Sequence, residues 1–258
     1  MPAYLEQGEG DTAVFLLHGV GGGKEAWAHN QPVLASHGFR TVAWDMPGYG
    51  ASAPLSPCTN ALLADALKTL IEHVGARRNV LLGHSMGGMV AQELVALHPT
   101  LVHGLILYST SPAFGKADGD WQQQFLQSRF APLDRGLGMA GLANQLVPTM
   151  FAPDADPARI AEAAALMARV PAESYRAALS AIVSFNRLAA LGNIAVPTLC
   201  LAGALDLNAP PAVVEKMASR IPGAAYVCLP QVGHIANIEQ PGLFNNAVLT
   251  FLKKHFLP

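Results

Sequence analysis

Residues 79–88, which read Asn-Val-Leu-Leu-Gly-His-Ser-Met-Gly-Gly, are the most informative segment of the sequence. Gly83 and Gly87 each stand two residues from Ser85, which is the G-x-S-x-G pattern of a nucleophile elbow. The glycines leave room for a strand to turn sharply into a helix, and such a turn exposes the serine hydroxyl. The helix expected over 86–97 would direct its first amides and its positive dipole end at a developing anion. A small-residue turn without chemistry has the same pattern, so the context must be examined.

Short apolar runs on both sides of this turn predict strands that are buried on both faces. The runs are residues 13–17, 41–44, 80–82, 105–108, 198–202 and 225–229. Helical patterns over 61–75 and 86–97 lie between the early runs. Strands that alternate with helices imply a mainly parallel sheet with helices on both faces. In such sheets, ligands bind beyond the carboxyl ends of the strands.

The pattern changes from Pro112 to about Leu191, where strand-type runs disappear and helical periodicity takes over. Helices are predicted over 137–147, 158–170 and 175–191, and three aromatic residues upstream of them have helical spacing, namely Trp121, Phe125 and Phe130. We therefore predict an α/β core formed by residues 1–111 and 191–258, interrupted by a helical insertion of residues 112–190.

Length and composition agree with one large globular domain. The 258 residues are 51% hydrophobic and 13% charged, with a net charge of −2, so nothing indicates a nucleic-acid or membrane partner. Cys58, Cys200 and Cys228 have neither disulfide-framework nor zinc-ligand spacing, which favours reduced thiols. The first residues do not have the pattern of a secretion signal, so we expect a cytoplasmic protein. A homodimer is left open.

A serine nucleophile needs a base, and the base needs an acid that orients it. His234 follows the last strand-like run in a short polar turn, from which it could face Ser85. Asp206 follows the run 198–202 directly, between the serine and the histidine in chain order. The alternatives are a solvated loop histidine and an ordinary turn aspartate. Five other aspartates lie in the helical insertion and are interpreted as surface charges: Asp118, Asp120, Asp134, Asp154 and Asp156.

Acyl transfer also needs two amide donors for the oxyanion of the tetrahedral intermediate. The Met86 amide, next to the nucleophile, is the first candidate. The second is the Val20 amide, in the glycine-rich loop of residues 18–23 that follows the first apolar run. A dinucleotide site is the rival interpretation of this loop, but Lys24 stands where the third glycine of that fingerprint belongs. A phosphate-binding P-loop also fails, because Glu25 follows Lys24 instead of serine or threonine.

Five segments in this order resemble the α/β-hydrolase family over nearly the full length of the chain. They are His18-Gly19, residues 44–52, residues 83–87, Asp206 and Gly233-His234. The resemblance implies an α/β-hydrolase fold, with a mostly parallel doubly wound sheet and a helical lid inserted after the sixth core strand. It also implies that Asp45 to Ser52 form a structural turn at the rim of the sheet.

Within the family, the chain looks most like 3-oxoadipate enol-lactonases, meta-cleavage-product hydrolases and small carboxylesterases. This resemblance implies a serine hydrolase that cleaves a small apolar or aromatic-derived ester or lactone through an acyl-enzyme. Its triad would be Ser85, His234 and Asp206, its oxyanion hole would be Val20 and Met86, and no cofactor or metal is implied. Carbon–carbon bond hydrolysis, cofactor-free perhydrolysis or oxygenation, and ligand binding with little turnover remain alternatives. Four apolar side chains of the insertion form either a substrate pocket or the insertion's own core: Trp121, Phe125, Phe130 and Met139.

Overall fold

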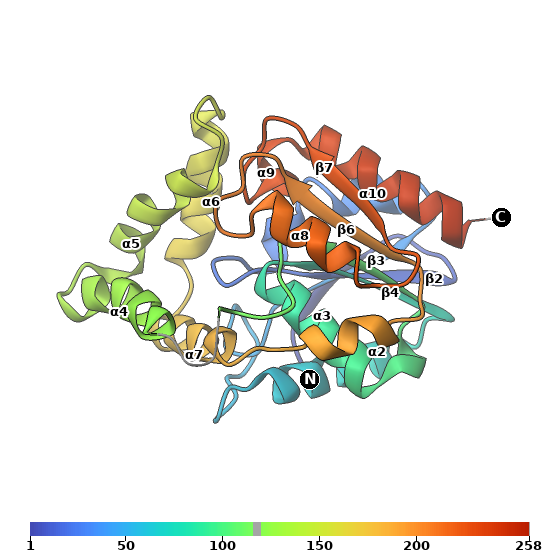
Figure 1. The fold of residues 1–258 in the computed structure, drawn as a ribbon, viewed down its shortest axis with the longest axis horizontal. Helices are drawn as coiled ribbons and strands as arrows, with labels where there is room; N and C mark the ends of the chain where they lie inside the picture. The colour runs from blue at the N-terminus through green and yellow to red at the C-terminus, as the bar shows by residue number, and fades with distance from the viewer. Residues whose placement is uncertain (116–119, 258) are drawn as a thin grey trace.

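The computed structural model describes residues 1–115 and 120–257. In these residues one sheet of seven strands has the spatial order β1-β3-β2-β4-β5-β6-β7 (Figure 1). The strands are β1 (Tyr4–Gln7), β2 (Thr12–Leu17), β3 (Arg40–Trp44), β4 (Arg78–His84), β5 (Gly104–Tyr108), β6 (Thr198–Gly203) and β7 (Ala225–Leu229). Only β1 pairs in the antiparallel sense, with β3. The predicted α/β class with a mostly parallel sheet is therefore confirmed.

The apolar runs of the sequence coincide with the central strands because these strands are buried on both faces. All six residues of β2 are buried, as are all residues of β5 and β6. The sequence analysis did not predict β1, a mostly exposed edge strand in which Leu5 is 46% exposed. An edge strand that faces solvent carries no continuous apolar signal, so it cannot be recognised from such runs.

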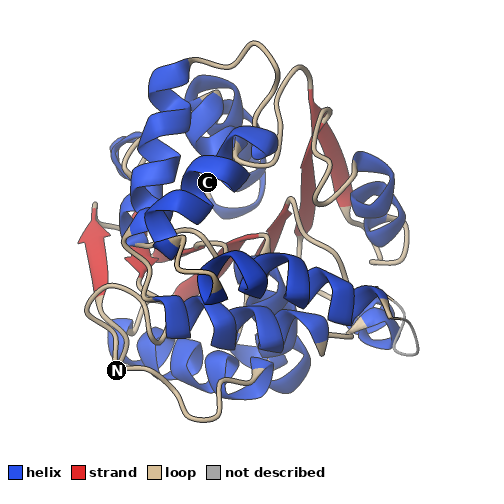
Figure 2. Ribbon diagram, turned by 90° about the vertical axis from the view of Figure 1, so that its left-hand side faces the viewer, coloured by secondary structure: helices blue, strands red, loops and turns tan. Residues whose placement is uncertain are grey.

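Helices cover both faces of the sheet (Figures 1 and 2). Helices α1 (Gln31–Ser36) and α10 (Pro241–Phe256) contact each other on one face, and α2 (Asn60–Val74) and α3 (Met86–Leu97) pack together on the other. The short helices complete the connections: η1 (Lys24–Trp27), η2 (Pro99–Leu101), α8 (Pro211–Ala218) and α9 (Ala236–Glu239). The Thr59 side chain accepts a hydrogen bond from the Leu62 amide and so caps the start of α2. Gly75 ends that helix with a φ of 62°.

Among the described residues, four α-helices lie between β5 and β6 and project to one side of the sheet, on the left in Figure 1. They are α4 (Trp121–Asp134), α5 (Gly138–Leu146), α6 (Pro157–Ala168) and α7 (Ala172–Val183), joined by η3 (Val147–Met150) and followed by η4 (Leu188–Asn193). The expectation that the insertion follows the sixth core strand is wrong. In the described residues the insertion follows β5, the fifth strand in chain order. That count came from the family resemblance, whereas the sequence itself has four apolar runs before the insertion, to which the structure adds β1.

The two ends of the helical segment are joined where it leaves the core. The Phe114 amide donates to the Phe185 carbonyl at 3.1 Å, and the Arg187 amide donates to the Pro112 carbonyl at 2.7 Å. The predicted helix over 175–191 therefore stops at Val183, because the chain must extend to form these bonds. Across the described residues, no helix is both long enough and apolar enough to span a bilayer.

Candidate active site

Ser85 occupies a strained turn between β4 and α3. Its φ of 51° and ψ of −115° lie outside the regions that L-residues normally adopt. A side chain at Gly83 would approach the Gly87 carbonyl oxygen to 2.5 Å, and one at Gly87 would overlap the Leu17 carbonyl oxygen. The Thr110 hydroxyl donates to the Ser85 carbonyl at 2.7 Å and so supports the turn from the end of β5. The G-x-S-x-G spacing is thus required by the backbone packing around the serine.

His234 and Asp206, which are 28 residues apart in sequence, are in direct contact. Both lie beyond the carboxyl ends of neighbouring strands, Asp206 after β6 and His234 after β7. His234 Nδ1 is 2.8 Å from Asp206 Oδ2, and both side chains are almost completely buried. Asp206 Oδ1 accepts hydrogen bonds from the Asn208 and Ala209 amides at 2.8 and 2.9 Å. These bonds fix the carboxylate, which in turn fixes the orientation of the imidazole.

The pKa of Asp206 lies below its ordinary value. Burial alone would raise this pKa, but the positive charge available on His234 and the hydrogen bonds from His234, Ala209 and Asn208 outweigh it. Asp206 is therefore ionised at neutral pH. An ionised carboxylate at Nδ1 favours the tautomer with its proton on Nδ1, which leaves Nε2 free to accept a proton.

A second histidine, His84, holds the backbone of His234. His84 Nε2 donates to the His234 carbonyl oxygen at 2.9 Å, and the Tyr108 hydroxyl donates to the same oxygen at 3.0 Å. The His84 ring also stacks on Tyr108, with 4.7 Å between the ring centroids. Burial, and next the nearby charge of His234, lowers the pKa of His84 to about 3, so this imidazole is neutral. The sequence analysis missed both roles, because His84 occupies a variable position of the elbow pattern and Tyr108 ends an ordinary apolar strand.

The glycine-rich loop passes directly over the elbow. A side chain at Gly19 would come within 3.2 Å of Ser85 Cβ, so the following Val20 amide lies close to the nucleophile. The Gly19 carbonyl oxygen accepts hydrogen bonds from His18 Nδ1 at 2.8 Å and from the Gly22 amide at 3.0 Å. Because a trans peptide places its N–H opposite its carbonyl, these two bonds also fix the direction of the Val20 N–H.

His18 can hold this loop because it is neutral and uses both ring nitrogens. Its Nδ1 faces the Gly19 carbonyl, which can only accept, and its Nε2 accepts from the Met46 amide at 3.0 Å. Burial lowers the pKa of His18 to about 4. Behind the loop, the buried Asp45 carboxylate binds Lys24 Nζ at 2.6 Å and the Lys24 amide at 3.1 Å. Lys24, which replaces the third glycine of the dinucleotide-binding pattern, thus anchors the loop to the turn after β3.

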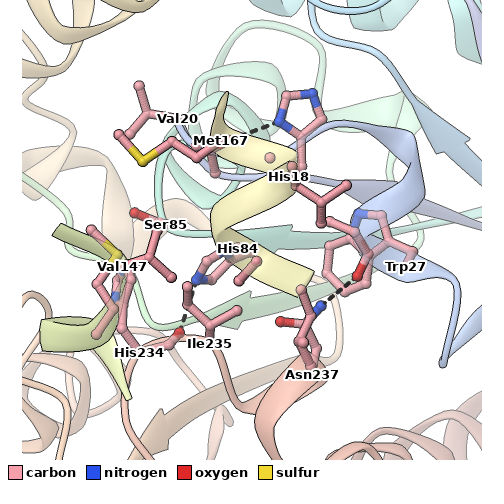
Figure 3. Close-up of a pocket in the computed structure, with 18 of the residues that line it drawn as sticks. His18, Val20, Trp27, His84, Ser85, Val147, Met167, His234, Ile235 and Asn237 are labelled. Atoms are coloured by element: carbon pink, nitrogen blue, oxygen red, sulfur yellow. Dashed lines mark hydrogen bonds between the residues drawn. The ribbon is translucent and has the colours of Figure 1, made fainter. Parts of the chain in front are cut away.

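Two cavities meet at Ser85. The inner cavity is bordered by Ser85 and His234 at one end and by Trp27 and Asn237 at the other (Figure 3). Most of its lining is apolar and includes Met167 of α6. The outer cavity shares five lining residues with it, namely Val20, Ser85, Met150, Tyr175 and His234. Ser85 and His234 thus line both cavities.

The Ser85 hydroxyl and His234 Nε2 face the same space but form no hydrogen bond within the described part of the chain. Hydrogen bonds between catalytic groups often become short only when substrate is bound. The Val20 and Met86 amides likewise bind no protein acceptor among the described residues. Both amides are therefore available to a ligand.

The remaining candidates of the sequence separate into two groups. Trp121 and Phe125 line the outer cavity, whereas Phe130 and Met139 line neither cavity and pack within the helical segment. Four of the aspartates are exposed, as expected: Asp120, Asp134, Asp154 and Asp156. Asp118 lies outside the described residues. The three cysteines are free, and no group of three potential ligands among the described residues is arranged to hold a metal ion.

An acid, a histidine and a serine at the carboxyl edge of a parallel sheet define the class of hydrolytic α/β enzymes. The comparison with protein families agrees: residues 12–241 match the family model described as alpha/beta hydrolase fold. The chain therefore belongs to the α/β-hydrolase family and is an enzyme of that family.

Known proteins resemble the chain over almost its full length. A Mycobacterium tuberculosis protein that carries the provisional name of a non-heme bromoperoxidase is 29% identical, over 96% of both chains. An esterase from Thermogutta terrifontis is 27% identical, covers 98% of this chain and 94% of its own, and has a TM-score of 0.89. The enol-lactonase from Burkholderia xenovorans LB400 is 28% identical, covers 97% and 96%, and has a TM-score of 0.88.

Proposed function

We propose that this enzyme hydrolyses a carboxylic ester or a lactone through an acyl-enzyme formed on Ser85. The observation that carries the proposal is the buried 2.8 Å contact between His234 Nδ1 and Asp206 Oδ2, beside an elbow serine that lines the same cavities as His234. The names of similar proteins, an esterase and an enol-lactonase, support this reaction class.

In the first half of the reaction, His234 Nε2 takes the proton of Ser85 as its oxygen attacks the carbonyl carbon. The tetrahedral oxyanion is held by the Val20 and Met86 amides, which need no reorganisation because the loop and the elbow are already fixed. His234 then donates its proton to the leaving alkoxide as the ester bond breaks. Asp206 stays ionised throughout and stabilises the imidazolium.

In the second half, water replaces the leaving alcohol. His234 takes a proton from the water as the water attacks the acyl carbon, and it returns the proton to Ser85 as the acyl–oxygen bond breaks. The products are a carboxylic acid and free enzyme. In a lactone, both products are parts of one molecule, a hydroxy acid.

The inner cavity favours a small apolar group on the substrate. Its titratable lining groups are His18, His84, Tyr175 and His234. The first two are neutral because burial lowers their pKa values to about 4 and about 3, and Tyr175 is neutral because burial raises its pKa to about 12. A charged group placed there would lose its hydration without gaining a partner. We further propose that residues 112–190 act as a lid, because α6 and α7 supply Met167 and Tyr175 to this cavity.

The proposal is tested by replacing Ser85 and following the hydrolysis of short p-nitrophenyl esters. Ser85→Ala should lower kcat by roughly three orders of magnitude or more, because the nucleophile and its base act as one unit. Ser219→Ala, which removes an exposed hydroxyl that lines neither cavity, is the matched control. A fluorophosphonate should label the wild type at Ser85 and leave Ser85→Ala unlabelled. Hydrolysis by Ser85→Ala at the wild-type rate would rule out the proposed nucleophile.

A second reaction, perhydrolysis, has one specific observation in its favour, the provisional bromoperoxidase name of the Mycobacterium tuberculosis relative. Hydrogen peroxide in place of water would attack the acyl-enzyme and release a peroxy acid, with the same proton transfers. Product analysis in the presence of an ester and hydrogen peroxide separates the two reactions. The rates of peroxy acid and carboxylic acid formation are each divided by the concentration of the nucleophile, hydrogen peroxide or water. A higher normalised rate for the peroxy acid would favour perhydrolysis.

A further inference from the structure

The outer cavity contains a charged residue that the proposed reaction does not use. Arg129, on α4, lines this cavity together with Ser85 and His234. Its guanidinium lies over the Phe125 ring at 5.2 Å from the centroid, and its only hydrogen bond within the described part of the chain is a long one to Ser128 Oγ, at 3.4 Å. A guanidinium has five N–H donors, so most of its hydrogen-bonding capacity is unfilled.

Three other arginines of residues 112–190 are paired with carboxylates. Arg159 binds Glu162, Arg176 binds Asp134, and Arg187 binds Glu93. Arg129 has no carboxylate partner among the described residues, and neither do Arg135 and Arg169, which are exposed. Of these three arginines, only Arg129 is half-buried and lines a cavity that contains Ser85.

A second observation indicates that the outer cavity accepts a polar ligand. Ser109, at the end of β5, lines it and is completely buried, yet its hydroxyl has no hydrogen-bond partner in the described part of the chain. Buried polar groups are normally paired, so the Ser109 hydroxyl at the cavity wall keeps its capacity to bind a polar group of a ligand. Ser109 also has a φ of 46°, an unusual conformation for a non-glycine residue.

The charge of Arg129 acts inside the cavity. Tyr175 lines both cavities, and burial raises its pKa. The positive charge of Arg129 is close enough to Tyr175 to lower this pKa in part. Burial still raises the pKa of Tyr175 to about 12, so it is a neutral hydroxyl and does not cancel the positive charge. The inner cavity, in contrast, has no permanently charged side chain among its described lining residues.

We propose that Arg129 binds a carboxylate on the substrate, so that the natural substrate is an ester or lactone with an apolar group on one side of its carbonyl and an anionic arm on the other. The apolar group occupies the inner cavity and the anionic arm extends through the outer cavity to α4. Arginine suits this role because its planar fork matches the two oxygens of a carboxylate. This assignment rests on the proposed function, since it requires the reacting carbonyl at Ser85.

A matched pair of substrates tests the assignment. Mono-p-nitrophenyl adipate and p-nitrophenyl hexanoate have the same chain and leaving group, but only the first ends in a carboxylate. The measured quantity is the ratio of kcat/KM for the anionic ester to kcat/KM for the neutral ester. Arg129→Gln should lower this ratio about tenfold, and Arg129→Lys should retain part of it, because a point charge replaces the fork.

Arg135→Gln is the control, because Arg135 directly follows α4, is exposed and lines neither cavity. It should leave the ratio unchanged. If Arg129→Gln lowers both kcat/KM values equally, the ratio stays constant and the assignment fails, although hydrolysis of the neutral ester would still support the proposed function. If the wild-type enzyme hydrolyses neither ester, the proposed function fails and this assignment with it.

Discussion

His84 Nε2 donates a 2.9 Å hydrogen bond to the backbone carbonyl oxygen of His234. The contact joins the residue before the elbow serine to the loop after β7, 150 residues later in the chain. The bond requires a proton on Nε2, because a carbonyl can only accept, and burial lowers the pKa of His84 to about 3, so the ring is neutral. The residue next to the proposed nucleophile therefore positions the proposed base.

Replacement of His84 tests this positioning role. His84→Gln keeps an N–H donor near the position of Nε2, whereas His84→Leu removes the donor and leaves the volume similar. We expect His84→Leu to lower kcat by roughly ten- to a hundredfold, because a small displacement of a catalytic group is costly. His84→Gln should restore most of the activity. The pH profile of kcat, measured for both variants, should shift only for His84→Leu, and equal losses of kcat with unchanged profiles would indicate a structural role alone.

Asp206→Asn should abolish most activity without unfolding the protein. Asparagine still offers an oxygen to the Asn208 and Ala209 amides, but its amide group donates to His234 Nδ1 and forces the proton onto Nε2. With the wrong tautomer, kcat should fall by about 10³- to 10⁴-fold, because replacement of the triad aspartate by asparagine has an effect of this size in serine proteases. Steady-state kinetics and thermal unfolding are the measurements. Asp154→Asn, at an exposed site, is the control and should match the wild type in both.

The stability of the fold should decrease in mild acid because His18 and His84 are buried and neutral. Their pKa values, about 4 and about 3, lie below the ordinary value of 6.5 that both regain on unfolding. The unfolded state therefore binds more protons than the folded state between these limits. The stabilisation is complete above the ordinary value and is lost as the pH falls toward the folded values. From roughly pH 7 to pH 5 the free energy of unfolding should fall by about 2 kcal/mol per histidine.

Urea unfolding at a series of pH values measures this effect, and His84→Gln supplies the comparison because glutamine does not titrate. Over the same pH range, the free energy of unfolding should fall less for the variant than for the wild type. The difference should be about the contribution of one histidine. Parallel curves for the two proteins would mean that the pKa of His84 is the same in the folded and unfolded states, against the lowering of that pKa by burial.

Gly87→Ala should destabilise the protein by about 3 kcal/mol or more, because the added methyl group would overlap the Leu17 carbonyl at the end of β2. Gly242→Ala is the matched control, since nothing lies within 4 Å of a side chain placed there, near the start of α10. It should change stability by less than about 1 kcal/mol. Chemical denaturation of both variants gives the two values, and similar values would contradict the packing argument for the elbow.

Much of the fold could be predicted because its central strands are buried on both faces. The boundaries of α3 and β7 agree with the sequence analysis residue for residue, and β2, β3, β5 and β6 agree to within one residue. Buried parallel strands require unbroken apolar runs, which remain visible in the sequence. The edge strand β1 has no such run and was not predicted, and α10 was not predicted either, although Phe244, Val248 and Leu252 have helical spacing. The helix expected over 175–191 was too long, because tertiary hydrogen bonds from Phe114 and Arg187 redirect the chain after Val183.

The proposed catalytic residues were selected from the sequence on their order and their position after strands. That order is informative because the carboxyl ends of parallel strands all meet at one edge of the sheet, wherever the strands stand in the chain. The contact expected between Asp206 and His234 is present in the structure, while the catalytic roles of these two residues and of Ser85, Val20 and Met86 stay predictions.

Local pattern was enough to specify the buried strands, the elbow and the order of the polar residues that follow the strands, because each of these depends on neighbours within a few positions. Three other features depend on contacts between distant segments, and only the folded chain reveals them. They are the bonds from His84 and Tyr108 to the His234 carbonyl, the His18 bond that orients the Val20 amide, and the arginine in the outer cavity. The physical reason is that a side chain's partner, burial and pKa depend on which remote residues surround it, and no short stretch of sequence contains that information.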